Sequence, residues 1–138
     1  MKVWDAKTGD LLQTLEGHSG EVTSVCFNHD GSQLASASVD RTVKVWDAKT
    51  GSVLRTLKKH SKVVASVCFN RDGSQLASGS YDGTVTLWDA KTGDPVQTFE
   101  GHSNGVNSVC FNDDGSKVAS GSEDKTVKVW DAKTGSVV

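Results

Sequence analysis

The sequence Trp-Asp-Ala-Lys-Thr-Gly at residues 46–51 decides the fold, because the same six residues occur four times along the chain. The tryptophans of the four copies are spaced 42 residues apart, at Trp4, Trp46, Trp88 and Trp130. A period of about 40–45 residues is typical of proteins in which one supersecondary unit recurs. The sequence therefore predicts an array of copies of one unit.

Each period contains four short runs with the composition of strands, and no run has the 3.6-residue periodicity of a helix. In the first period these runs are residues 22–27, 33–38, 42–46 and 53–57. Turn residues separate them, such as Asn28 to Ser32, where a glycine supplies a positive φ. The only proline, Pro95, falls in a fourth strand, which favours an outer sheet edge for that strand. The sequence predicts an all-β chain of four-stranded antiparallel units.

Four strands per period, with Gly-His near the start and Trp-Asp near the end, resemble the WD-repeat family of β-propellers over the whole chain. The resemblance implies blades of four antiparallel strands packed radially around a channel. It divides the chain into three blades, at residues 16–58, 59–100 and 101–138. Residues 1–15 are then a partial repeat.

The resemblance also implies a hydrogen-bonded tetrad in each blade, in which Asp and Ser contact the two imidazole nitrogens and the indole N–H donates to Ser. The matching residues are His18, Ser36, Asp40 and Trp46, then His60, Ser78, Asp82 and Trp88, then His102, Ser120, Asp124 and Trp130. Ser38, Ser80 and Ser122 are alternatives for the serine. A nucleophilic Ser-His-Asp triad is the competing interpretation, but a catalytic group has no reason to recur in every copy.

Composition and cysteine spacing limit the other functions. The net charge of −2 gives no basis for a nucleic-acid or membrane partner, and we expect a cytoplasmic protein. Cys26, Cys68 and Cys110 recur at one position of successive blades, too far apart for disulfides, and they lack the spacing of a zinc site. We expect three buried, reduced thiols, no metal, no cofactor and no enzymatic activity.

Comparison of the copies with one another locates the surface that varies. Two turns of each blade are nearly invariant, and the family resemblance places them on one side of the disc. The varying residues belong to the other side, which in the family commonly binds peptides or proteins. This candidate binding face comprises Glu21, Val39, Arg41, Lys62, Tyr81, Asn104, Glu123 and Lys125. Drift at exposed positions is the alternative. Lys58, Lys59 and Lys62 also form a basic cluster, either a solvated loop or a site for an acidic ligand.

Three blades are fewer than a closed propeller of this family needs, so we expect copies of the chain to close a ring together. Residues 11–15 of one chain would supply the fourth strand to the last blade of another. A homo-trimer with nine blades is preferred slightly to a homo-dimer with six. Met1 to Asp5 would then be displaced, since Trp130 has tetrad partners in its own copy and Trp4 has none.

The expected function is that of a peptide- or protein-binding scaffold, built either from a fragment of a longer array or from an amplified or designed sequence. A purely structural, self-assembling unit without a ligand is the alternative.

Overall fold

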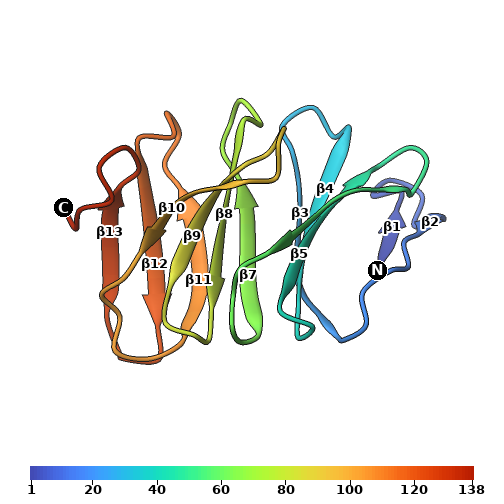
Figure 1. Ribbon diagram of the computed structural model, residues 1–138. Coiled ribbons are helices and arrows are strands. Elements are labelled where there is room, and N and C mark those ends of the chain that lie inside the picture. Colours follow the sequence, from blue (N-terminus) through green and yellow to red (C-terminus); the bar gives the residue numbers. More distant parts are fainter.

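The computed structural model describes residues 1–138 as thirteen strands in four antiparallel sheets, which follow one another in chain order (Figure 1). An N-terminal hairpin consists of β1 (Lys2–Trp4) and β2 (Leu11–Thr14). The first blade consists of β3 (Val22–Phe27), β4 (Gln33–Ser38), β5 (Thr42–Asp47) and β6 (Val53–Lys58). The middle blade consists of β7 (Val64–Phe69), β8 (Gln75–Ser80), β9 (Val85–Asp89) and β10 (Pro95–Phe99). The last blade consists of β11 (Val106–Phe111), β12 (Lys117–Ser122) and β13 (Val127–Asp131). Val137 adds a single bridge to Trp130.

The strands of each blade pair in sequence order, so β10 lies at the edge of the middle blade, where Pro95 costs no ladder hydrogen bond. The recurring Trp-Asp-Ala-Lys-Thr-Gly segment makes the turn between the third and fourth strands. In the first blade, Asp47 Oδ1 accepts hydrogen bonds from the backbone N–H groups of Lys49 and Thr50, at 2.9 and 2.8 Å. Gly51 follows with a φ of 77°, a conformation that residues with a Cβ rarely adopt.

The hydrophobic core lies between the blades rather than within them. Val43, Val45 and Leu57 on one face of the first blade pack against Val67 and Trp88 of the middle blade, and all five are buried. An equivalent cluster joins the middle and last blades. The blades are therefore held together by the faces that they share, as expected for stacked repeats.

Hydroxyl groups tie the innermost strands to one another. The backbone N–H of Val67 donates to Ser24 Oγ at 3.3 Å, and that of Val109 donates to Ser66 Oγ at 3.1 Å. Strand β7 thus lies between β3 and β11, which fixes the angular relation of the blades.

Two faces remain without a complete neighbour. Val127 on β13 is 74 % exposed, whereas its counterparts Val43 and Val85 are fully buried. At the other end, Val25 and Phe27 are each 52 % exposed on β3. The N-terminal hairpin covers only the outer part of that end, where Leu15 packs in one cluster with Leu34 and Trp46.

One expectation from the sequence needs correction, and another stays a prediction. The displacement of Met1 to Asp5 is expected in a ring of several chains; in the single chain β1 pairs with β2, with Lys2 opposite Thr14. Cys26 and Cys68 are half-buried, but Cys110 is exposed, because it lies on the uncovered face of the last blade. All three thiols are free, and burial raises the pKa of Cys68 to about 12.

Candidate functional site

The tetrad residues of each blade meet at hydrogen-bonding distance. In the middle blade, His60 Nδ1 lies 2.9 Å from Asp82 Oδ2, and His60 Nε2 lies 2.7 Å from Ser78 Oγ. The indole Nε1 of Trp88 donates to the same Ser78 Oγ at 2.8 Å. The equivalent contacts measure 2.8, 2.6 and 2.8 Å for His18, Asp40, Ser36 and Trp46, and 2.8, 2.7 and 2.8 Å for His102, Asp124, Ser120 and Trp130.

The network fixes one protonation pattern. Ser78 accepts from the indole, so its own hydroxyl proton is directed to His60 Nε2, and the Nδ1–H of His60 then donates to Asp82. The four groups come from three elements: the loop before β7, strand β8 with its following turn, and the end of β9. Each tetrad thereby ties the incoming loop to the middle two strands of its blade.

Threonine completes the shell around each aspartate, a contact that the sequence analysis missed. Thr84 Oγ1 donates to Asp82 Oδ1 at 2.6 Å and the Thr84 backbone N–H donates to it at 2.9 Å. The backbone N–H of Ser61 donates to Asp82 Oδ2 at 3.2 Å. The signal was present in the sequence, since Thr follows Asp by two residues at Thr42, Thr84 and Thr126.

Ser38, Ser80 and Ser122 do not substitute for the tetrad serine. Ser80 Oγ donates to the carbonyl of Val63 at 2.8 Å and accepts from the backbone N–H of Asp82 at 3.1 Å. Ser80 is the last residue of β8, where it lies beside the loop that precedes β7 rather than beside the indole. These serines stabilise the turn that carries the aspartate.

The environment shifts the pKa values of the charged members. Burial alone would raise the pKa of Asp82, but hydrogen bonds from Thr84 and His60 outweigh it, and the pKa lies below its ordinary value. Burial lowers the pKa of His60, against the opposing effect of Asp82. The pair therefore favours a carboxylate beside a neutral imidazole at neutral pH.

The Ser-His-Asp order of contacts resembles that of a nucleophilic triad, but the chemistry available differs. Ser78 is fully buried, and its oxygen already accepts the Trp88 indole proton. A substrate carbonyl has no approach to that oxygen. The arrangement serves to satisfy buried polar groups, and it holds the loop in place.

The candidate binding face lies along the edge opposite the Trp-Asp turns, because alternate connections of an antiparallel meander fall at opposite ends of the strands. All eight of its side chains are exposed: Glu21, Val39, Arg41, Lys62, Tyr81, Asn104, Glu123 and Lys125. They are spread over three blades rather than gathered in one pocket. Tyr81 reaches the next blade, where it lies against Gly105.

No group of three or more His, Cys, Asp or Glu side chains comes together in a way that could hold a metal ion. The structure contains no helix able to span a lipid bilayer.

Two four-stranded antiparallel blades and a third of three strands, each with the same buried tetrad, define the chain as an array of β-propeller blades. The sequence profile of the WD40 family, described as "WD domain, G-beta repeat", matches residues 9–47, 51–89 and 93–131. The chain belongs to this family.

Curated relatives match the chain one repeat at a time. Periodic tryptophan protein 2 homolog of Schizosaccharomyces pombe is 55 % identical over 42 residues, which is 30 % of this chain and 5 % of that protein. U3 small nucleolar RNA-associated protein 15 homolog of Xenopus tropicalis is 51 % identical over 45 residues, 32 % of this chain and 9 % of that protein. The matched segment thus spans less than a tenth of either relative.

Proposed function

We propose that this chain is a peptide- or protein-binding scaffold, and that copies of the chain assemble into a closed propeller. The observation that carries the proposal is the exposure of Val127, which is 74 % exposed where Val43 and Val85 are fully buried. A buried counterpart in both preceding blades indicates that this face is built for a further blade.

The two uncovered faces have complementary chemistry. Between the first and middle blades, Val67 packs against Val43 and Val45. Val25 is the exposed counterpart of Val67 at one end, and Val127 and Val129 are the exposed counterparts of the two valines at the other. A head-to-tail contact between copies would repeat the packing already present inside the chain. A ring formed by such contacts closes only at a whole number of chains. The proposed forms are a trimer with nine blades and a dimer with six.

A pair of matched variants tests the self-association. Val127→Lys places a charge on the uncovered face, and Val96→Lys places the same charge at an exposed position of β10, outside both faces. Light scattering after size exclusion should give the mass of one chain, 14.6 kDa, for Val127→Lys. The Val96→Lys variant should keep the multiple found for the parent. Equal masses for both variants and the parent would refute the proposed contact.

The ligand-binding part of the proposal rests on Tyr81, an exposed aromatic side chain at the centre of the varying face. Aromatic side chains are enriched among the residues that dominate binding energy. Peptides selected against the parent should lose affinity for Tyr81→Ala at least tenfold, and they should bind His29→Ala, on the opposite edge, as well as the parent. If no peptide is enriched, the purely structural assembly is the better description.

A further inference from the structure

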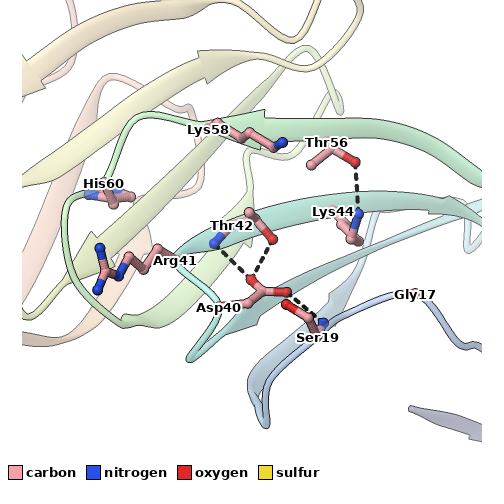
Figure 2. A pocket seen from close by; sticks show the side chains of 9 residues that line it. All are labelled: Gly17, Ser19, Asp40, Arg41, Thr42, Lys44, Thr56, Lys58 and His60. Carbon is pink, nitrogen blue, oxygen red and sulfur yellow. Dashed lines mark hydrogen bonds between the residues drawn. The ribbon is translucent and has the colours of Figure 1, made fainter.

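A polar depression of about 510 Å³ opens at the outer part of the first blade, and none of its nine lining residues is apolar (Figure 2). Three of them are cations, namely Arg41, Lys44 and Lys58, and only Asp40 is an anion. Lys44 and Lys58 project from neighbouring strands β5 and β6, and Arg41 projects from the turn before β5.

The carboxylate does not neutralise these cations. Asp40 Oδ1 accepts from Thr42 Oγ1 at 2.6 Å and from the Thr42 backbone N–H at 2.9 Å. Asp40 Oδ2 accepts from His18 Nδ1 at 2.8 Å and from the Ser19 backbone N–H at 3.1 Å. No salt bridge joins Asp40 to Arg41, Lys44 or Lys58, so the three positive charges have no anionic partner in the chain.

The strand register holds two of the cations at a separation suited to a shared anion. Thr42 pairs with Lys58 and Lys44 pairs with Thr56, so the two lysines are diagonal neighbours on one face of the sheet. Diagonal neighbours lie roughly 7–8 Å apart, within reach of one another's long side chains. Lys44 Nζ is held by Thr56 Oγ1 at 2.9 Å, which orients one ammonium group in the depression.

The fold does not require these cations, because the middle blade carries none of them at the same positions. Gly83, Thr86 and Glu100 of the middle blade replace Arg41, Lys44 and Lys58. Arg41 also has a φ of 74°, a conformation that favours the glycine found at position 83. A side chain at this position is thus disfavoured by the backbone, both at Arg41 and at its counterpart Lys125, which has a φ of 72°. The last blade repeats two of the cations as Lys125 and Lys128, but only the first blade combines all three.

We propose that Arg41, Lys44 and Lys58 form a binding site for a phosphoryl group, either free phosphate or a phosphorylated side chain of a peptide. The planar guanidinium offers paired donors that match phosphate oxygens, and the two ammonium groups supply further charge. Of the basic cluster Lys58, Lys59 and Lys62, this proposal assigns only Lys58 to a site for an acidic ligand, because Lys59 and Lys62 lie outside the depression. All its residues belong to one chain. Lys44 lies on the face of the first blade that the proposed self-association would cover, since its counterpart Thr86 is fully buried between blades, so the site is proposed for the unassembled chain.

The test is a titration of the full-length chain with sodium phosphate at constant ionic strength, followed through backbone amide chemical shifts. Saturable shifts are expected at residues 17–19, 40–44 and 56–58. The variant R41G/K44T carries residues that the middle blade already accommodates, and it should weaken binding at least tenfold. The matched control K125G/K128T changes the same two positions of the last blade by the same charge, and it should bind phosphate like the parent.

A third variant, K58E, introduces the glutamate that the middle blade carries at this position and should also abolish saturable binding. Linear, non-saturating shifts in the parent would overturn the proposal, as would an equal loss in R41G/K44T and K125G/K128T. A phosphoserine peptide that binds at least tenfold more tightly than inorganic phosphate would identify a modified side chain as the source. Equal affinities would identify free phosphate. A monomeric parent that binds phosphate would refute the self-association and leave this site intact.

Discussion

Replacing Trp88 by alanine should cost far more stability than the same replacement of Trp4, although both tryptophans begin an identical hexapeptide. Trp88 is 1 % exposed and donates an indole hydrogen bond to Ser78 at 2.8 Å, whereas Trp4 is 55 % exposed and its indole has no hydrogen-bond partner. Truncation of a buried Trp costs about 3–5 kcal/mol. Truncation at Trp4 should cost about 1 kcal/mol or less, because surface replacements have small effects.

The assay is urea unfolding followed by circular dichroism, with all proteins at one concentration so that any self-association contributes equally. In a thermal melt of the same proteins, the melting temperature of Trp88→Ala should fall by about 12–20 °C, at about 4 °C per kcal/mol for a chain of this size. For Trp4→Ala a shift of about 4 °C or less is expected. Equal shifts for the two variants would refute the assignment of Trp88 to a buried tetrad that Trp4 lacks.

Three further predictions concern the tetrad and the N-terminus. Thr84→Val should lower the free energy of unfolding by about 1–2 kcal/mol, since it removes the hydroxyl that donates to Asp82. Thr86→Val should be neutral or stabilising, because the Thr86 hydroxyl is buried without a hydrogen-bond partner. The urea midpoints of the two variants make the comparison. The lowered pKa of His60 means that the unfolded chain binds more protons below about pH 6.5, so stability should fall as pH drops from 7.5 to 5.5, and His60→Asn should show a shallower fall. Deleting Met1 to Asp5 should leave the assembled mass unchanged, and a loss of assembly on size exclusion would contradict this.

Strand positions and turns could be predicted closely from the sequence, because each strand lies between turn residues that recur in every copy. The run at residues 33–38 is the same in the structure, and the run at 42–46 extends by one residue to Asp47. Local chemistry determines these elements, so they can be predicted from a single sequence.

Contacts that depend on neighbouring elements were harder to predict. The role of Thr84 required the turn geometry that brings its hydroxyl to Asp82, even though the Asp-x-Thr spacing recurs. The cation site required the register of β5 against β6, which places Lys44 and Lys58 on one face. The exposure of Cys110 depends on what covers the last blade, and no local pattern specifies that.

The most direct test of the proposed assembly is the native mass of the folded chain at micromolar concentration. We expect a single species with the mass of three chains of 14.6 kDa for a nine-bladed ring, or of two chains for a six-bladed ring. A folded, monodisperse species of 14.6 kDa would contradict it.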